Sequence, residues 1–543
     1  MYPLVLHSMN EFTVILNTPK QTLPIGYREP LNEINTFSII KNNSKNMFSH
    51  KNITILFLEN VETDWLQIVE LYLKYGFEYI LQLMNGKITF LLYDNNSSQL
   101  YSKLFIARDY FGQYPLYFGN IMDNQFGVST LKQNLVNPIL KKAPYHELGK
   151  EIEKIQEFPI GSYVEFSLHF NVLAKWKQVS PPIKYFQFPF VNFFNKKDKF
   201  IIETEMYDIL KQLQKRVINS IQNMFSANPD FIPGCLLSGG LNSGIVASLL
   251  CNEYLRKGQS PKRVFTYCIG FKNSEDIKYA RITANHLGTT HTEIIIDETE
   301  YMKTVNIAIQ ILETADVKTI RAGVFYYLAV KYIKNKSDAT HIIDGYGADE
   351  YMGGNLYMHL SPDMIDFDNM CRLNLTQFHE FYGKFFKITN FFNLTRVSPF
   401  MDTNIVNYYL SIPPQFRWNP GSLQVFDKYK LIEKYLLRFA FSDYLNVKYN
   451  LLLPEDILWR TKEEFFDGIT CFQEPIYKMI SKELEKQNQS RNEIQYYSHL
   501  FHQIFGYTYD KINMFQYIET TEPSAYSLDF YFDYNPEYQD RTI

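Results

Sequence analysis

Cysteine is scarce in this chain and is confined to its second half. The five cysteines stand at positions 235, 251, 268, 371 and 471, so the first 234 residues contain none. Their odd number and the lack of any CxxC spacing argue against a disulfide framework and against a zinc knuckle. We therefore expect a protein of a reducing compartment, the cytoplasm.

Long apolar runs and an excess of one charge are also missing. The best apolar stretch, Ala322 to Val330, is about half of the roughly 20 residues that span a bilayer. The start, Met1 to Leu4, has no basic segment followed by a long apolar one, so we expect no secretory signal. The 54 basic and 58 acidic residues give a net charge of −4, which provides no overall attraction for nucleic acid or an anionic membrane. Any phosphate must be bound by local groups.

Glycine and proline are few, 24 and 23 in 543 residues, whereas phenylalanine and tyrosine are abundant at 44 and 41. We attribute the aromatic content to an AT-rich genome, because basic residues do not interleave with the aromatics as a base-stacking surface requires. At about 150 residues per domain, the length predicts two to four domains. The apolar share of 46% and the charged share of 21% are typical of globular proteins.

The chain divides into two parts with different periodicity. Up to about residue 180, short β-rich runs at 12–16, 53–58, 88–93 and 162–166 predict a sheet layer, with a helix at 65–75. After a linker near 180–199, helices alternate with short apolar strands: strands at 235–237, 263–269, 293–296 and 340–343, and helices at 203–223, 244–256, 276–287 and 300–335. This alternation predicts a parallel, doubly wound α/β sheet. We expect two domains, 1–190 and 200–543.

The most specific motif is the segment from Leu236 to Gly244, LLSGGLNSG, which lies between a predicted strand and a predicted helix. A Ser-Gly-Gly turn lets backbone N–H groups converge on an anion, and the hydroxyls and the helix N-terminus add further attraction. The segment lacks the GxxxxGK[ST] pattern of a Walker A loop. By itself such a turn is as often a simple helix N-cap, so the surrounding motifs decide its meaning.

With its surroundings, the loop resembles the SGGxDS pyrophosphate loop of the N-type ATP pyrophosphatases, and of glutamine-dependent asparagine synthetases in particular. Segments similar to other motifs of this family follow in order: 266–271, 276–280, 286–291, 345–350, 398–402, 457–468 and 522–525. In the first part, the segments 83–94, 106–112 and 115–117 resemble the family's glutaminase domain. The resemblance implies an α+β β-sandwich of the Ntn-hydrolase type (class-II glutamine amidotransferase), then a PP-loop ATP-pyrophosphatase domain with a helical C-terminal part.

Members of this family adenylate the β-carboxylate of aspartate with ATP, release pyrophosphate, and let ammonia attack the acyl-adenylate to give asparagine and AMP. The resemblance therefore implies ATP, Mg²⁺, aspartate, and ammonia or glutamine, with a homodimer as the candidate assembly. It assigns ATP and pyrophosphate to ten positions: Leu236, Ser238, Gly239, Gly240, Leu241, Asn242, Ser243, Ile269, Asp344 and Gly345. It assigns the remaining roles as follows: pyrophosphate to Lys462, Mg²⁺ to Asp349 and Asn242, and the acyl-adenylate to Thr319 and Arg321.

Departures from the family pattern limit what the first part can do. The family's glutaminase uses an N-terminal cysteine thiolate that is exposed by methionine removal. Position 2 is Tyr2, and a phenol with a pKa of about 10 cannot replace a thiolate. Asp64 falls where the family binds the glutamine amino group, but it is equally suited to cap a helix that begins at Trp65. Provided that the chain begins at Met1, we expect that glutamine hydrolysis is lost and that ammonia is used.

Departures in the second part leave two interpretations open. Asn242 replaces the loop aspartate, Asp344 replaces a serine and places an anion near ATP, and Tyr346 replaces a glutamate on which adenylate formation depends. Losing one such group typically costs about 3 kcal/mol of transition-state stabilisation. The chain is then either a ligase that works with ammonia, or an inactive homologue kept as a nucleotide-binding or regulatory protein. A β-lactam synthetase fits less well, because the segments 457–468 and 522–525 resemble those of asparagine synthetases.

Overall fold

The fold consists of two compact units, which we describe separately. The computed structural model describes residues 13–16, 37–40, 47–57, 64–84, 89–95, 101–121, 125–142, 148–169, 175–186, 199–227, 231–419, 432–445, 453–460, 476–486 and 492–507. Unit 1 comprises Met1–Gln187, His379–Asn393 and His502–Tyr507, and unit 2 comprises Phe188–Phe378, Leu394–Phe501 and Thr508–Ile543. The first change of unit, between residues 187 and 188, falls within the predicted linker. The two later returns of the chain to unit 1 have no counterpart in the sequence pattern.

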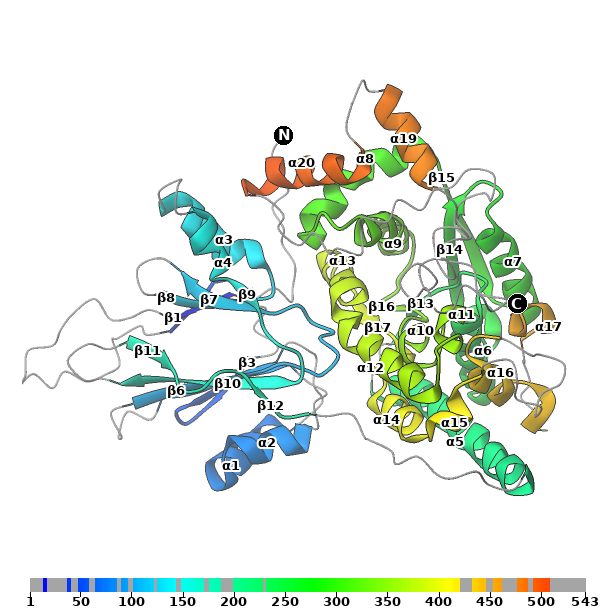
Figure 1. Cartoon of the computed structure of the whole chain (residues 1–543), viewed down its shortest axis with the longest axis horizontal. Helices are drawn as coiled ribbons and strands as arrows, with labels where there is room; N and C mark the ends of the chain where they lie inside the picture. The colour runs from blue at the N-terminus through cyan, green and yellow to red at the C-terminus, as the bar shows by residue number, and fades with distance from the viewer. Residues whose placement is uncertain are drawn as a thin grey trace, which may run out of the picture. The chain divides into compact units, whose positions relative to one another are not determined.

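Unit 1 contains two antiparallel sheets (Figure 1). The first has the order β2-β1-β8-β7-β9, formed by β1 (Thr13–Leu16), β2 (Phe37–Ile40), β7 (Tyr117–Ile121), β8 (Gln125–Ser129) and β9 (Gln156–Glu157). The second has the order β11-β10-β6-β5-β4-β3, with β12 also paired to β10. Its strands are β3 (Met47–His50), β4 (Ile53–Phe57), β5 (Phe90–Asp94), β6 (Tyr101–Ala107), β10 (Ser162–His169), β11 (Lys175–Gln178) and β12 (Ile183–Lys184).

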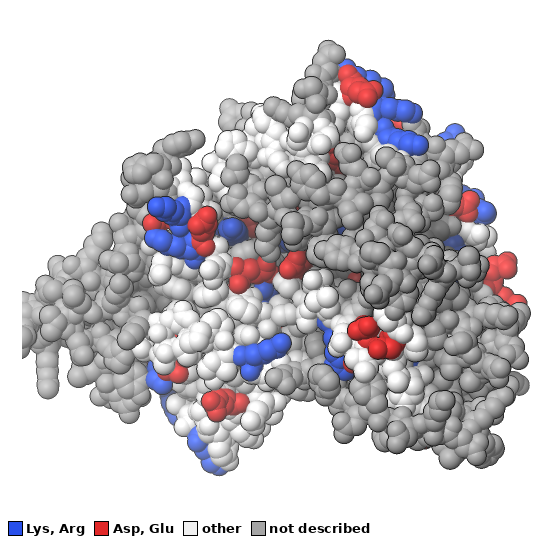
Figure 2. Space-filling view, in the orientation of Figure 1, with Lys and Arg blue, Asp and Glu red and all other residues white. Residues whose placement is uncertain are grey.

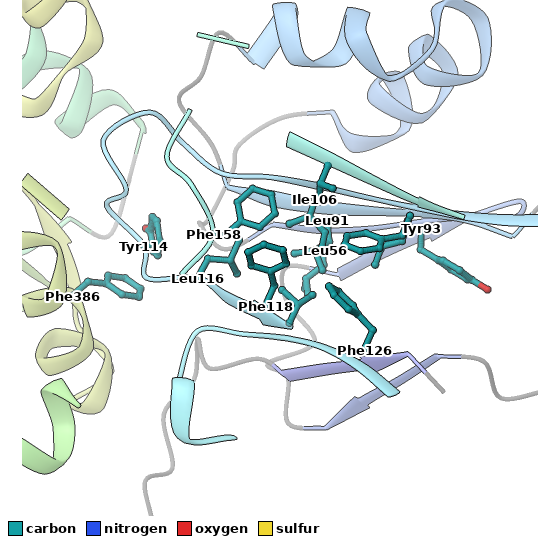
Figure 3. Close-up of a cluster of buried hydrophobic side chains, with 14 residues drawn as sticks. Leu56, Leu91, Tyr93, Ile106, Tyr114, Leu116, Phe118, Phe126, Phe158 and Phe386 are labelled. Atoms are coloured by element: carbon teal, nitrogen blue, oxygen red, sulfur yellow. The ribbon is translucent and has the colours of Figure 1, made fainter. Parts of the chain in front are cut away.

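Both faces of the second sheet are buried, and the alternation of its side chains explains why. Leu104 and Ile106 of β6 lie in the core between the two sheets (Figure 3), whereas Phe105 and Ala107 belong to a second core with the helices α1 (Trp65–Tyr75) and α2 (Phe77–Met84). A third core packs α3 (Lys132–Lys142) and α4 (Leu148–Glu153) against the first sheet. The predicted β-sandwich is therefore confirmed.

A segment from far along the chain completes the core of unit 1. The helix α13 (Phe386–Phe391) belongs to this unit, and its Phe386 lies in the core between the sheets. The Phe386 ring meets Tyr114 edge-on, with ring centroids 4.1 Å apart (Figure 3). The buried Lys387 follows, with its ammonium nitrogen 3.5 Å from the hydroxyl of Tyr117. The core of the β-sandwich thus combines the stretch that ends at Gln187 with one that begins at His379, 192 positions further along the chain.

Unit 2 is built on a parallel five-stranded sheet in the order β15-β14-β13-β16-β17. The strands are β13 (Pro233–Leu236), β14 (Phe265–Phe271), β15 (Thr290–Ile296), β16 (His341–Ile343) and β17 (Thr395–Val397). The connecting helices are α6 (Leu241–Arg256), α7 (Glu275–Leu287), α8 (Glu298–Leu312) and α9 (Val317–Lys336), with α7 and α9 on opposite faces of the sheet (Figure 1). This arrangement confirms the predicted doubly wound sheet.

One predicted helix is wrong in extent. The stretch 300–335 was expected as one helical segment, but it forms α8 and α9 with a break between them. Glu313 ends α8 in a left-handed conformation, with φ at 51°, and the Asp316 carboxylate caps α9 by accepting from the N–H of Thr319 at 2.7 Å. An acidic residue whose side chain accepts a hydrogen bond from the N–H three residues later is typical of a helix start. The capping residue therefore fixes this boundary, and the spacing of the hydrophobic residues does not.

The rest of the described part of unit 2 is mainly helical. Its α-helices are α5 (Lys199–Ala227), α10 (Ala348–Tyr351), α11 (Leu356–His359), α12 (Met364–Phe381), α14 (Thr403–Ser411), α15 (Pro414–Arg417), α16 (Tyr435–Ala440), α17 (Glu455–Leu458), α19 (Ile476–Lys486) and α20 (Glu493–Phe505), the last turns of α12 and α20 belonging to unit 1. In the described parts of the chain, none of the helices is long and apolar enough to cross a membrane. Figure 2 shows basic and acidic side chains interspersed over the described part of one face.

Candidate functional site

The order of the strands in unit 2 places a topological switch point beside β13. The chain moves from β13 to β14 and β15 on one side of the sheet, and then returns to β16 on the other side of β13. Ligands of open α/β sheets bind at such a switch point, outside the carboxyl ends of the two diverging strands. Here these ends lead into the loop Leu237–Gly240 and into the loop Asp344–Gly347. The two most specific sequence motifs therefore meet at the position where the fold favours a ligand.

The loop after β13 is arranged to expose N–H groups. Ser238 and Ser243 hold its two ends together: the Ser238 N–H donates to the Ser243 hydroxyl at 3.2 Å, and the two hydroxyls lie 3.1 Å apart. The following helix, α6, has Gly240 as its N-cap, and no side chain caps it. The first N–H groups of a helix have no partner within the helix, so those of α6 can bind an anion. This arrangement suits a phosphate or pyrophosphate group.

Two glycines allow the backbone segments of the site to approach one another. Gly239 has φ at 74°, and a Cβ atom there would lie 2.5 Å from the backbone nitrogen of Ala280 and 2.5 Å from the Cβ of Tyr279 on α7. Gly345 packs against the start of α6, since its Cβ would lie 2.8 Å from the nitrogen of Ser243. Side chains at either position would separate the loop from its neighbours.

Asp349 and Asn242, the two expected Mg²⁺ ligands, are in direct contact. The Asn242 amide nitrogen donates to Asp349 Oδ2 at 3.2 Å, and the ammonium of Lys434 donates to Asp349 Oδ1 at 2.6 Å. Lys434 is almost fully buried, and it lies at the N-cap of α16. The Asn242 side-chain oxygen is buried and has no hydrogen-bond partner among the described residues. Sequence motifs gave no indication of Lys434, which stands 85 residues beyond Asp349.

This set of groups does not fit a magnesium ion held by the chain. Mg²⁺ takes six oxygens and commonly uses one or two carboxylates among them. Of the two expected ligands, the Asp349 carboxylate already binds an ammonium and an amide, and Asn242 offers one neutral amide oxygen. A divalent cation that shared Asp349 with Lys434 at about 4 Å would be repelled by about 8 kcal/mol at an effective dielectric constant near 20. No cluster of three or more His, Cys, Asp or Glu residues suited to a metal lies in the described ranges.

Asp344 is balanced within the fold. Its carboxylate accepts from Arg396 at 2.8 Å, from the Ser398 hydroxyl at 2.5 Å and from the Tyr326 hydroxyl at 3.1 Å. The side chains of Asp344 and Arg396 are only 3% and 7% exposed, so water screens this pair little. The anion that the sequence was expected to place near ATP is therefore neutralised by Arg396. The sequence motifs did not indicate Arg396, because it lies two residues before the segment 398–402 that resembles a family motif.

Tyr346 stands on the same loop, and its backbone N–H donates to Asp344 at 3.3 Å. Arg396 lies over the Tyr346 ring, with the guanidinium carbon 5.4 Å from the ring centroid. Burial of the hydroxyl and the nearby Asp344 raise the pKa of Tyr346 far above its usual value. The phenol therefore stays protonated at any working pH and cannot supply the negative charge of a glutamate.

The two residues expected at the acyl-adenylate have partners elsewhere. Thr319 is buried, and both its N–H and its hydroxyl donate to the capping carboxylate of Asp316. Arg321 forms a two-point ion pair with Glu493 of α20, at 3.0 Å and 2.5 Å. The structure thus gives both side chains contacts that stabilise α9.

The remaining expected residues are placed as follows. Leu236 ends β13 and Leu241 begins α6, while Ile269 lies in the neighbouring strand β14. Leu236 and Ile269 are half-buried, as the walls of a crevice would be, and Leu241 is buried. Lys462 lies outside the described residues, and so do Tyr2 and the segment 522–525.

Arg460 is a further basic residue at the phosphate loop that was not singled out from the sequence. One of its guanidinium nitrogens donates to the carbonyl of Gly239 at 3.3 Å and lies 3.9 Å from Asp276. The guanidinium carbon lies 3.9 Å from the centroid of the Tyr279 ring. Arg460 therefore connects the loop to α7. Its position in the segment 457–468, two residues before Lys462, was the only signal for it.

In unit 1, the expected glutamine-binding residue has a local role. Asp64 is exposed, and it caps α1 by accepting from the N–H groups of Leu66 and Gln67 at 3.1 and 3.3 Å. Elsewhere in unit 1, the fully buried Arg108 donates to the carbonyls of Tyr114 and Phe158. These contacts are those of a folded scaffold, and Asp64 takes the capping role that the sequence had left as an alternative.

His359 supports the turn beside Asp349 and makes the stability of the site depend on pH. Its Nε2 donates to the carbonyl of Gly353 at 3.1 Å, and its Nδ1 accepts from the N–H of Asn419 at 3.1 Å, so the ring is neutral. The adjacent Gly354 packs on Asp349, where a Cβ would lie 2.2 Å from the Asp349 Cα. Burial lowers the pKa of His359 to about 4.

We expect the free energy of unfolding to fall as the pH is lowered from about 6.5 to about 4. In this window the unfolded chain binds a proton at His359 and the folded chain does not, which costs about 1.4 kcal/mol per pH unit and about 3 kcal/mol in all. Urea unfolding between pH 4 and 8 measures this slope. It should become shallower in His359→Gln and stay unchanged in the control His286→Gln, whose histidine is exposed on α7. Equal slopes in wild type and His359→Gln would contradict the prediction.

Comparison with known proteins agrees with this geometry. The family model described as "Asparagine synthase" matches residues 229–369 and 361–522, and the model described as "Glutamine amidotransferase domain" matches residues 57–164. The chain is 29% identical over 490 residues to the glutamine-hydrolysing asparagine synthetase of Rattus norvegicus, covering 86% of this chain and 81% of that protein. It is 28% identical to that of Homo sapiens over the same shares. It is 30% identical to that of Mesocricetus auratus, covering 77% of this chain and 70% of that protein.

Proposed function

The chain belongs to the asparagine synthase family, and from this premise we propose that it is an ATP-dependent amide ligase that converts aspartate to asparagine with ammonia. The proposal rests on one observation: the loops Leu237–Gly240 and Asp344–Gly347 lie together at the switch point of the sheet. This arrangement presents uncapped N–H groups of α6 to a phosphate chain. The family match supplies the substrate class.

The proposed reaction has two steps. An oxygen of the aspartate β-carboxylate attacks the α-phosphorus of ATP, a P–O bond forms, and pyrophosphate leaves with the electrons of the broken P–O bond. Ammonia then attacks the acyl carbon, loses a proton, and displaces AMP. The N–H groups at the start of α6 and the Ser238 and Ser243 hydroxyls would stabilise the charge on the leaving pyrophosphate. Arg460, held on the Gly239 carbonyl, would keep this loop in place.

The choice of ammonia over glutamine rests on unit 1. None of the first 234 residues is a cysteine, and cysteine is the nucleophile that glutamine hydrolysis of this kind requires. Asp64, the residue aligned with glutamine binding, is engaged at the N-terminus of α1. For a chain that begins at Met1, we therefore propose that unit 1 keeps the β-sandwich without its amidotransferase activity.

A nitrogen-source assay tests the proposed function. We expect the full chain to release pyrophosphate from ATP and aspartate, and to form asparagine and AMP, when ammonium is supplied and not when glutamine replaces it. Exchange of labelled pyrophosphate into ATP, with aspartate and without ammonium, isolates the adenylation step. Coupled pyrophosphate detection and mass spectrometry of the amino acids are the readouts.

The outcomes separate the two interpretations that the sequence left open. Asparagine formation from glutamine would refute the assignment of the nitrogen source. Binding of ATP without either pyrophosphate exchange or asparagine formation would favour an inactive homologue that binds nucleotide, as the replacement of two acidic groups by Asn242 and the protonated Tyr346 would allow. A chain that does not bind ATP would overturn both interpretations.

A further inference from the structure

Lys434 occupies a position that sequence motifs did not assign. Its ammonium donates to Asp349 Oδ1 at 2.6 Å, and Asp349 in turn accepts from Asn242 at the start of α6. Two hydrogen bonds thus connect the lysine to the helix whose N-terminus faces the proposed phosphate site. The lysine side chain is only 4% exposed, so the ammonium is held where water screens its charge little.

Two basic side chains lie near Asp349, one at the N-cap of α16 and one within this helix. Arg438, one turn beyond Lys434 on α16, also interacts electrostatically with Asp349 and forms a buried pair with Glu433. Asn242 contributes no charge. The Lys434 ammonium already places a positive charge beside the Asp349 carboxylate. A divalent cation bound to the same carboxylate oxygens would be repelled by Lys434.

We propose that Lys434 is the fixed cation of the site and takes the place of a metal ion bound by the chain. Asp349 then holds Lys434 in position instead of ligating Mg²⁺, and the ligand recognised beside this pair is a diphosphate or triphosphate group that needs no metal held by Asp349 or Asn242. The proposal deepens the proposed function and rests on it, because both concern the same site. It predicts that removing the charge of Lys434 lowers the affinity for pyrophosphate, whereas removing the charge of Asp349 does not.

The sign of these effects follows from charge. Lys434→Met removes the cation and leaves the Asp349 carboxylate facing an anionic ligand, so the affinity for inorganic pyrophosphate in EDTA should fall at least about tenfold, as expected for losing one charged contact. Asp349→Asn keeps the ammonium without its counter-ion, so the same affinity should stay equal or rise. If Asp349 ligated a metal, Asp349→Asn would instead lower the pyrophosphate affinity when Mg²⁺ is present.

Calorimetric titration of the full chain with inorganic pyrophosphate, in EDTA and in Mg²⁺, measures these affinities. Electron paramagnetic resonance of added Mn²⁺ measures metal binding by the chain alone, and we expect wild type and Asp349→Asn to leave the same amount of Mn²⁺ free. Lys434→Arg, which retains the charge, should restore most of the affinity lost in Lys434→Met. Lys387→Met is the matched control, because Lys387 is also a buried lysine but belongs to unit 1.

Four results would overturn the proposal: a Mn²⁺ site in wild type that Asp349→Asn removes, a loss of pyrophosphate affinity in Mg²⁺ on Asp349→Asn, full affinity in Lys434→Met, or no binding of pyrophosphate by wild type in EDTA. The wild-type and Asp349→Asn measurements decide the question even if Lys434→Met fails to fold. None of these titrations needs aspartate or turnover. A chain that binds metal-free pyrophosphate but forms no asparagine would keep this inference and refute the proposed function.

Discussion

Gly239→Ala is expected to reduce kcat/KM for ATP at least about 100-fold, the scale of effect that a displacement of about 1 Å produces in a catalytic site. Two costs add at this position. The left-handed backbone, with φ at 74°, disfavours any side chain, and the new Cβ would lie 2.5 Å from both the Ala280 nitrogen and the Tyr279 Cβ. Because these atoms belong to α7, the loop itself must move, and its N–H groups lose their alignment on the phosphates.

Gly258→Ala is the matched control. Gly258 has φ at 70°, nearly the same conformation, but a Cβ there would meet no atom within 4 Å, and the residue follows the far end of α6. It should lose about 1 kcal/mol of stability and keep its activity. Steady-state kinetics with thermal unfolding of both variants separates strain from the collision with α7. A Gly239→Ala protein with nearly full activity would show that the loop does not position the phosphates.

Arg396→Met is expected to destabilise unit 2 by about 3–5 kcal/mol, the usual cost of leaving a buried charge without its partner. Asp344 would lose its ion pair at 2.8 Å while remaining almost inaccessible to water. The double variant Asp344→Asn/Arg396→Met removes both charges, and the asparagine can still accept from Ser398 and from the N–H of Tyr346. It should recover at least about half of the loss, which urea unfolding would measure.

Arg281→Met serves as the control for this prediction. Arg281 forms a two-point pair with Glu293, at 2.6 and 2.8 Å, but its side chain is 55% exposed. Exposed pairs of this kind contribute about 0–1 kcal/mol, so the variant should stay within about 1 kcal/mol of wild type. Similar losses in Arg281→Met and Arg396→Met would mean that burial does not set the importance of the Asp344 pair.

The parts of the fold that could be predicted are those encoded by local patterns. Short β-rich runs indicated four of the strands of unit 1, whereas its β-sandwich was implied by the family resemblance. Apolar strands between amphipathic helices indicated the doubly wound sheet. The Ser-Gly-Gly turn indicated the loop that joins β13 to α6, because its glycines and hydroxyls act over a few residues. The break between α8 and α9 was also encoded locally, in the Asp316 cap, but the hydrophobic period alone did not show it.

The parts that could not be predicted are pairings between distant residues. Arg396 reaches Asp344 across 52 positions, and Lys434 reaches Asp349 across 85. No periodicity of the sequence encodes such contacts. The effect of a replaced family residue was therefore predicted without knowledge of the side chain that it contacts. Asp344 was expected to present an anion, and only the position of Arg396 shows that its charge is balanced inside the fold. Arg321 pairs with Glu493, which lies 172 positions away, and no sequence pattern indicated this pairing either.

The packing of α13 into unit 1 bears on how such a chain can change during evolution. Phe386 and Lys387 are buried against the N-terminal β-sandwich, and nine residues after Lys387 the same segment reaches Arg396, which neutralises Asp344. A deletion of the N-terminal 187 residues would leave the apolar surface of α13 uncovered in the middle of the remaining polypeptide. Natural selection can therefore retain the whole β-sandwich as a folding partner, whether or not it carries out a reaction of its own.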